Sequence, residues 1–193
     1  MCLKVVKNLL QQLNQSKYEV IKHHFIAKKK SDFNMYSLIL VHNIKPRIMK
    51  IAIGGDHAGF ELKQLVIELL KDLTHETKDF GPFTNESCDY PDYVHPLAKA
   101  VEGKEFDLGI IICGSGNGVN MVANKYKGIR SALCWEVEIA EMARAHNDAN
   151  ILAIPARYLS QELAFNIINT FLTTAFEGGR HQKRVDKISS CLD

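Results

Sequence analysis

Hydrophobic residues from Met49 onward follow two alternating patterns. Short apolar runs alternate with longer segments, such as 62–73, in which apolar residues recur every three or four positions. The short runs predict strands, and the longer spacing predicts amphipathic helices. We expect strands at 50–54, 75–80, 108–113, 130–134 and 150–154, and helices near 62–73, 91–103, 119–127, 137–146 and 160–176.

The alternation of strands and helices predicts one α/β domain. Strands as apolar as LGIIIC (108–113) are typical of a parallel sheet that helices cover on both faces. The polar run 75–80 suits the edge of such a sheet. Because no internal repeat or low-complexity linker divides residues 49–193, we expect a single doubly wound, Rossmann-like three-layer domain with a five-stranded parallel sheet.

Ligands of such sheets bind beyond the carboxyl ends of the strands, near the point where the strand order reverses. This rule selects GGDHAG (54–59) after the first strand, CGSGNG (113–118) after the third, and the turn after the fifth. It is an expectation about the fold and names no reaction.

The glycine-rich loop at 114–118 runs from the third strand into a predicted helix. Glycines allow sharp turns that present successive backbone amides, and a helix start adds partial positive charge, so the loop favours an anion. A dinucleotide fingerprint would need glycine at Val119, and a phosphate loop would need Lys followed by Ser or Thr. The loop therefore does not indicate a nicotinamide cofactor or a nucleoside triphosphate.

Cys113 comes directly before these amides. A thiol at a helix N-terminus can have a lowered pKa, which would make it a usable base or nucleophile. The alternative is that Cys113 is a small buried hydrophobic residue at a strand end. Its location alone does not decide between the two, whereas Cys88 and Cys134 lack the glycine neighbours and are interpreted as structural.

Two pairs of polar residues are further candidates for the site, and the first pair lies at the expected ligand face. Asp56 and His57 follow the first strand, and His146 and Asn147 end the helix before the fifth strand. A His at a helix end can also simply cap carbonyl groups. Each pair is weak evidence alone.

Arg180 and Arg184 are four residues apart, so on a helix both could hold a phosphate. The alternative is that this basic cluster is a solvated face. Taken together with the thiol, the anion-binding loop and the two histidines, the arginines indicate a proton-transfer site for a phosphorylated substrate.

Charge is distributed unevenly along the chain. Residues 1–48 carry nine Lys or Arg and two Asp or Glu, a formal charge of +7, whereas the remainder carries −5. The basic balance therefore belongs to the leading segment and gives no reason to expect nucleic-acid binding. Residues 1–48 lack the features of a secretory signal, and MKIAIGG at Met49 reads like the natural start of a first strand. We therefore interpret 1–48 as the product of an upstream start codon or a dispensable basic extension; an organellar targeting role is the alternative.

Cysteine usage and hydropathy bear on the compartment. The five cysteines are scattered and form no C-x-x-C pair, so a disulfide framework or a metal site is not expected and a reducing compartment fits best. No apolar run approaches the roughly 18 residues that span a bilayer, so no membrane association is expected.

At this point the sequence resembles the type B ribose-5-phosphate isomerase family, which includes the galactose-6-phosphate isomerase subunits. The resemblance covers Met49 to the C-terminus and none of residues 1–48. Five motifs in order carry it: GGDHAG, DYPDYV, ICGSGNGVNMVANK with the following KGIR, RAHNDANILAIPAR and EGGRHQKRV.

The resemblance implies roles for particular residues. Cys113 corresponds to the base that moves a proton between carbons 2 and 1, and Ser115 stands where the family often has Thr, a hydroxyl that shuttles protons between the substrate oxygens. His146 corresponds to the residue that helps to open the sugar ring, with Asp56 as its counterpart. The corresponding substrate-binding positions, which include the anion hole 114–118, are Asp56, His57, Tyr90, Gly114, Ser115, Gly116, Asn117, Gly118, Asn147, Arg157, Arg180 and Arg184.

The implied function is interconversion of D-ribose 5-phosphate and D-ribulose 5-phosphate through an enediolate, in the cytoplasmic pentose phosphate pathway and without a metal or other cofactor. One alternative is an isomerase for a six-carbon sugar phosphate, such as allose or galactose 6-phosphate. Another is a non-catalytic sugar-phosphate-binding homologue, which the retained thiol, histidine and glycine loop argue against. The expected assembly is a homodimer or a dimer of dimers with shared active sites.

Overall fold

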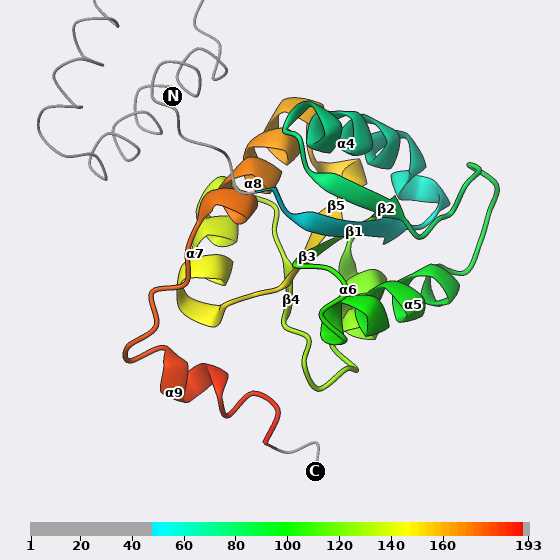
Figure 1. Cartoon of the computed structure of the whole chain (residues 1–193). Helices are drawn as coiled ribbons and strands as arrows, with labels where there is room; N and C mark the ends of the chain where they lie inside the picture. The colour runs from blue at the N-terminus through cyan, green and yellow to red at the C-terminus, as the bar shows by residue number, and fades with distance from the viewer. Residues whose placement is uncertain (1–47, 191–193) are drawn as a thin grey trace, which may run out of the picture. The chain divides into compact units, whose positions relative to one another are not determined.

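The computed structural model of the chain describes residues 48–190. The expected extension 1–48 lies outside the described residues except for Ile48. Strands and helices alternate as expected (Figure 1). The strands are β1 (Lys50–Gly55), β2 (Glu76–Asp79), β3 (Leu108–Cys113), β4 (Ser131–Leu133) and β5 (Ile151–Pro155). The helices are α4 (Phe60–Asp72), α5 (Tyr90–Glu102), α6 (Asn117–Ala123), α7 (Val137–Asn147), α8 (Gln161–Thr173) and α9 (Gln182–Val185), with 3-10 turns η1 (His57–Gly59) and η2 (Ala156–Tyr158).

The five strands form one parallel sheet in the order β2-β1-β3-β5-β4, which confirms the predicted fold class. β2 lies on one side of β1 and β3 on the other, so the strand order reverses between β1 and β3. The carboxyl ends of these two strands are therefore the place where a ligand is expected. Polar β2 lies at one edge, as predicted, and β4, with three residues, lies at the other.

Two hydrophobic layers enclose the sheet. Helices α4, α7 and α8 pack on one face, where Ile110 and Ile112 of β3 point. Helices α5 and α6 pack on the opposite face, where Ile111 and Cys113 point (Figure 1). All six residues of β3 are buried, because a central parallel strand has helices on both sides. Cys113 is thus both part of the core and the last residue of the strand that reaches the switch point.

Helices α6 and α8 end earlier than the sequence pattern predicts. After α6, the Asn124 side chain pairs with the backbone of Ser131, donating to its carbonyl at 2.9 Å and accepting from its amide at 2.8 Å. At the end of α8, the hydroxyls of Thr173 and Thr174 donate to the carbonyls of Asn169 and Thr170 at 2.7 Å. In both places short polar side chains bond to nearby backbone groups where the helix ends.

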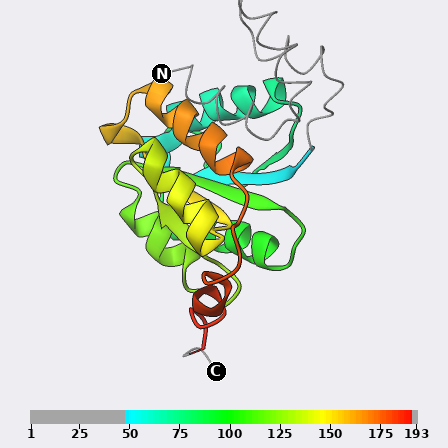
Figure 2. The ribbon, with the colours of Figure 1, turned by 90° about the vertical axis from the view of Figure 1, so that its left-hand side faces the viewer.

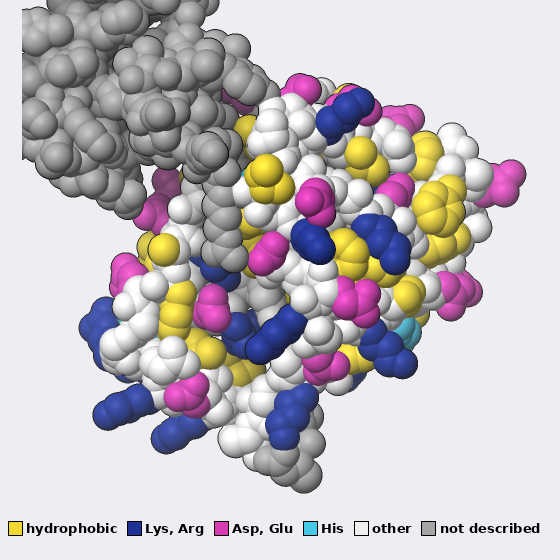
Figure 3. Space-filling view, in the orientation of Figure 1, with side chains coloured by type: hydrophobic (Ala, Val, Ile, Leu, Met, Phe, Trp, Pro, Cys, Tyr) yellow, Lys and Arg dark blue, Asp and Glu magenta, His cyan; other side chains and the backbone are white. Residues whose placement is uncertain are grey.

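The outer surface of residues 48–190 is mixed in charge. On the face in Figure 3, Lys and Arg side chains are interspersed with Asp and Glu. No helix of this part of the chain is long and apolar enough to cross a bilayer. The short α9, which the sequence did not predict, lies beyond the C-terminal end of α7 and away from the sheet (Figure 2).

Candidate active site

Loops at the carboxyl ends of β1, β3 and β5 surround a cavity of about 370 Å³. Eight predicted site residues line it, and the start of α5 contributes one of them. The lining residues are Asp56, His57, Tyr90, Cys113, Gly114, Ser115, Gly118 and Arg157, together with Ala58, which was not predicted. Gly116 and Asn117 belong to the same loop but do not line the cavity.

The turn after β1 places Asp56 against the end of β3. The Asp56 amide donates to the Ile112 carbonyl at 3.1 Å, and its Oδ1 accepts from the Gly59 amide at 2.9 Å. A side chain at Gly55 or Gly59 would collide with Ile112, since its Cβ would lie 1.8 or 2.3 Å from the Ile112 carbonyl oxygen. These glycines therefore allow the turn to touch β3, and the Asp56 carboxyl is held at the cavity with only 9% of the residue exposed.

His57 is oriented by a backbone amide from the loop between β2 and α5. The Cys88 amide donates to His57 Nδ1 at 3.3 Å, so Nδ1 is the acceptor and Nε2 carries the proton. A neutral His57 in this tautomer has one N–H group left for a bound anion.

The start of the loop between β2 and α5 is anchored by a buried cation. Lys63 of α4 is fully buried and pairs with Asp79, whose other oxygen accepts from the Gly81 amide at 2.8 Å. The Gly81 carbonyl in turn accepts from the Gly55 amide at 3.0 Å. These bonds tie the beginning of the loop to the same turn that carries Asp56.

The loop after β3 folds back onto the thiol of Cys113. Gly116 has a φ of 74°, and its amide donates to Cys113 Sγ at 3.1 Å. A Cβ at Gly116 would lie 2.3 Å from Leu133, and a Cβ at Gly118 would lie 2.6 Å from the Tyr90 ring. The glycines therefore let the loop approach the sulfur and let an aromatic ring pack against the helix start.

Arg157 brings a positive charge to the cavity from η2, directly after β5. Its amide donates to the Gly114 carbonyl at 3.1 Å, and a Cβ at Gly114 would lie 3.2 Å from Arg157 Nε. The guanidinium thus packs over the glycine loop, where it can meet an anionic group.

The lowered thiol pKa that a helix start can produce is not found at Cys113. Burial raises the pKa of Cys113, and the charge of Asp56 raises it further. The amides of Gly116, Ser115 and Val119 act in the opposite direction but do not outweigh these effects. Cys113 is 5% exposed, so the desolvation of a thiolate dominates.

The other described cysteines lie outside the cavity lining, as predicted. Cys134 is fully buried, and burial raises its pKa to about 12. Cys88 is partly exposed, and Cys88, Cys113 and Cys134 are all free thiols.

The remaining predicted residues form a second group around the C-terminal end of α7. The ring of His146 stacks on His181 at a centroid distance of 4.2 Å and an interplanar angle of 4°. Glu177 Oε2 lies 3.8 Å from His146 Nε2 and 3.6 Å from His181 Nε2. Arg180 Nε donates to His181 Nε2 at 3.3 Å, and Arg184 donates to the Arg180 carbonyl. This group does not line the Cys113 cavity.

His181 and Glu177 were not predicted as site residues. Both lie within the EGGRHQKRV motif, so the neighbouring Arg180 was a signal that could have pointed to them. Burial, then the neighbouring His146 and Arg180, lower the pKa of His181. A neutral ring suits its role as the acceptor of the Arg180 N–H.

The two histidines and Glu177 lie within 4.8 Å of one another, close enough to suggest a metal site. Their geometry is poor for a cation. A metal 2.0–2.1 Å from each Nε2 would have to lie near the plane of both rings, which parallel stacked rings do not allow. Arg180 also donates into the His181 lone pair that a metal would need.

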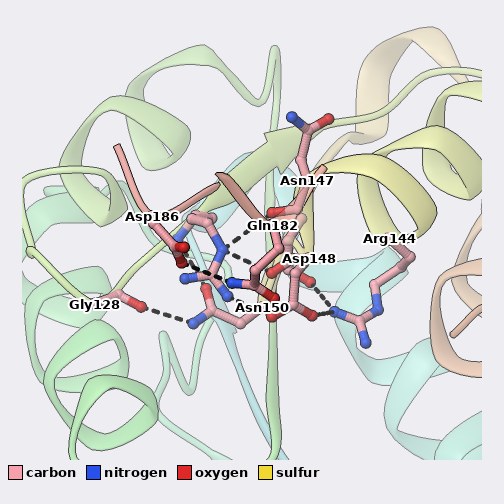
Figure 4. A network of polar contacts seen from close by, with 9 residues as sticks. Gly128, Arg144, Asn147, Asp148, Asn150, Gln182 and Asp186 are labelled. Atoms are coloured by element: carbon pink, nitrogen blue, oxygen red, sulfur yellow. Dashed lines mark hydrogen bonds and ion pairs between the residues drawn. The ribbon is translucent and has the colours of Figure 1, made fainter. Parts of the chain in front are cut away.

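A network of ion pairs fixes the end of α7 (Figure 4). Asp148, at a φ of 45°, accepts from Arg130 at 2.8 Å and from Arg144 at 2.9 Å. Arg130 Nε also donates to the carbonyls of Asn147 and Asp148, at 3.1 and 2.9 Å. The guanidinium thereby satisfies carbonyls that the helix end leaves free. The Asn147 side chain points away from this network (Figure 4).

Comparison with known proteins places this arrangement in a family. The sequence profile described as Ribose/Galactose Isomerase matches residues 51–188. The chain belongs to this family. The predicted membership of the ribose/galactose isomerase family is thus confirmed, and with it the prediction that the protein is an isomerase.

Individual members of the ribose/galactose isomerase family match over nearly their whole length. Ribose-5-phosphate isomerase B of Escherichia coli (strain K12) is 45% identical over 141 residues, which cover 73% of this chain and 95% of the relative. The Clostridium thermocellum ribose-5-phosphate isomerase B structure has a TM-score of 0.74 at 48% identity, covering 75% of this chain and 97% of that one. The Mycoplasma genitalium structure, with bound ribulose-5-phosphate, has a TM-score of 0.71 at 41% identity, covering 74% and 95%.

Proposed function

We propose that this protein interconverts D-ribose 5-phosphate and D-ribulose 5-phosphate through an enediolate intermediate. The observation that carries the proposal is the buried thiol of Cys113 in a cavity of about 370 Å³, beside a glycine loop and a buried carboxylate. The Escherichia coli relative, which is 45% identical to this chain over 95% of its own length, bears the name ribose-5-phosphate isomerase B.

The proposed chemistry begins with a proton on carbon 2 of the open-chain aldose. Cys113 removes this proton, and negative charge develops on the neighbouring oxygens as the enediolate forms. Backbone amides of the loop 114–118 stabilise that charge, an effect commonly worth a few kcal/mol per donor. Ser115 shuttles the proton between the two oxygens, and Cys113 returns its proton to carbon 1. The reaction uses only side-chain acids and bases and requires no cofactor.

Ring opening and phosphate binding use both groups of residues. His146 and Asp56 open the ring, Tyr90 lines the sugar pocket, and phosphate is held by His57, Asn147, Arg157, Arg180 and Arg184. Since His146 and its neighbours do not line the Cys113 cavity, we propose that they complete the cavity of a second copy of the chain. The assembly is then a homodimer, or a dimer of dimers, with shared sites.

The cellular setting follows from this chemistry. The proposed substrate and product belong to the pentose phosphate pathway. The free thiols at Cys88, Cys113 and Cys134 support the cytoplasm, a reducing compartment, as the location.

Substrate preference is tested by measuring kcat/KM for ribose 5-phosphate, allose 6-phosphate and galactose 6-phosphate on one preparation. We expect ribose 5-phosphate to be favoured by at least about tenfold, the scale on which one pocket discriminates substrates that differ by a small group. Preference for a six-carbon sugar would replace the proposed substrate. Turnover of none of the three would support a non-catalytic homologue.

A further inference from the structure

The carboxyl of Asp56 and the thiol of Cys113 are held together by backbone. Asp56 bonds through its amide to Ile112, the residue before Cys113. The Gly59 position fits so closely that a Cβ there would lie 3.0 Å from the Cys113 amide nitrogen. Both side chains line one cavity, and the backbone contact between the turn after β1 and β3 brings them to it.

The carboxylate of Asp56 lacks a paired cation. In residues 48–190, no Lys or Arg forms an ion pair with it, and its Oδ1 is occupied by the Gly59 amide. The other titratable groups that line the cavity are His57, Tyr90 and Arg157. The charge of Asp56 therefore acts on the thiol in a partly desolvated space, where charges interact more strongly than in water.

We propose that ionised Asp56 adds to burial in keeping the Cys113 thiol protonated, and that a proton arriving on Asp56 removes this added restraint. Formation of the thiolate is then coupled to the proton that ring opening of a bound sugar phosphate places on Asp56. The direction of the Cys113 pKa agrees, since burial raises it most and the charge of Asp56 raises it further. A resting site of this kind exposes little thiolate to oxidants and alkylating agents.

The catalytic consequence rests on the proposed function. During ring opening, the anomeric hydroxyl gives its proton to Asp56, and the O–H electron pair becomes the second bond of the carbon 1 carbonyl. The bond between carbon 1 and the ring oxygen breaks, and the ring oxygen keeps that pair and accepts a proton from protonated His146. With Asp56 neutral, the thiol gives its proton to solvent at the cavity more readily, and the thiolate takes the proton of carbon 2.

The test is the pH dependence of alkylation of Cys113 by iodoacetamide, an uncharged reagent, in the full-length protein. The Cys113 peptide is followed by mass spectrometry, so the other thiols do not interfere. Asp56→Asn has the shape of protonated aspartate and can still accept the Gly59 amide as a cap. Asp56→Ser, a second neutral capping residue, guards against a folding defect, and Glu162→Gln, an exposed acid on α8, controls for the loss of one charge.

We expect the midpoint of Cys113 alkylation to fall by about one pH unit in Asp56→Asn and Asp56→Ser, a typical effect of one neighbouring charge. Near neutral pH, alkylation then becomes about tenfold faster, whereas Glu162→Gln follows the parent. Midpoints within about 0.3 pH units of the parent in both folded Asp56 variants would overturn the proposal. The readout needs no turnover, so a failed isomerase assignment, in which Cys113→Ala remains active, is distinguished from a failed coupling.

Discussion

At Cys113, two influences favour the neutral thiol and three backbone amides favour the thiolate. The sequence motif around Cys113 contains only the amides, because Asp56 belongs to a loop 57 positions earlier in the chain. The sequence therefore pointed to the thiol but left the direction of its pKa open. What decides the ionisation is the tertiary contact between the ends of β1 and β3.

Replacing Cys113 by Ala should leave a folded protein whose turnover of ribose 5-phosphate falls at least about a hundredfold, the low end for loss of a positioned base. The change removes one sulfur atom and keeps the strand. Steady-state kinetics and circular dichroism measure the two effects. Cys88→Ala is the control, because Cys88 lies outside the cavity lining and keeps its amide bond to His57. Near-parental turnover in folded Cys113→Ala would refute the assignment of the base.

Cys134 should make the protein less stable at alkaline pH. Burial raises the pKa of this thiol from 9.0 to about 12, so between these values the unfolded chain loses the proton and the folded chain keeps it. The folded pKa is the higher one, and stability is therefore lost as pH rises, by up to about 1.4 kcal/mol per pH unit. The free energy of unfolding, measured with urea, should fall between about pH 9 and about pH 10. This fall should be about 1 kcal/mol smaller in Cys134→Ala than in the parent. Equal falls in parent and variant would contradict this account.

Helix α7 illustrates how an element is positioned by groups outside it. The helix carries His146 near its last turn, yet its end is fixed by Arg130, which precedes β4. Asp148 joins Arg130 to Arg144 while holding a left-handed backbone conformation that aspartate tolerates better than most residues. The position of His146 thus depends on an ion-pair network rather than on the helix alone.

Asp148→Ala should lower the free energy of unfolding by about 2 kcal/mol, because it removes two partly buried ion pairs and leaves Ala at a positive φ. Asp148→Asn keeps the backbone preference and one acceptor oxygen. It should lower the free energy of unfolding by about half as much. Denaturant melts of the two variants separate the contributions of backbone and charge. If Ala and Asn cost the same, the positive φ contributes nothing.

Elements with a strong apolar pattern were predictable, and those without one were not. All five strands and the helices α4, α5, α6, α7 and α8 follow from hydrophobic spacing, because burial between layers dictates it. α9 has four residues, fewer than the pattern needs to repeat, and the 3-10 turns have three each. The stacking of His146 on His181 could not be predicted either, because it joins two segments that share no periodic pattern.

On the scale of the whole molecule, the predicted site residues fall into two groups that one chain does not bring together. Cys113 and Asp56 line a cavity at the carboxyl ends of the strands, whereas His146 and Arg180 both contact His181, near α9. The two-fold dimer proposed above would resolve this separation by giving each cavity the second group of its partner.

Subunit mixing tests the shared site. Cys113→Ala and His146→Ala proteins, unfolded and refolded together, should recover about a quarter of parental activity, since half the dimers are mixed and each mixed dimer has one intact site. Mixing Cys113→Ala with Ser115→Ala, two lesions of the same cavity, should recover nothing, because every site then keeps one lesion. No recovery in the first mixture, despite proven exchange, would show that His146 does not act across the interface.

A shortened chain, residues 49–193, should retain the activity and the melting temperature of the full chain. The charge changes sign near this boundary, and the family match begins at residue 51. Comparison of kcat/KM and of thermal unfolding for the two chains measures the effect. Aggregation of the shortened chain, or loss of most of its rate, would assign a structural role to residues 1–48.

The two outer strands of the sheet have a consequence for colloidal behaviour. β2 has four residues with the charged Glu76 and Lys78 exposed, and β4 has only three residues. Long, flat and apolar outer strands recruit further strands and seed fibrils, whereas short and charged ones do not. The fully apolar strand LGIIIC is shielded in the middle of the sheet between β1 and β5. The edges of the folded sheet therefore offer little for strand-to-strand polymerisation, and pairing through β3 would first require that strand to be uncovered.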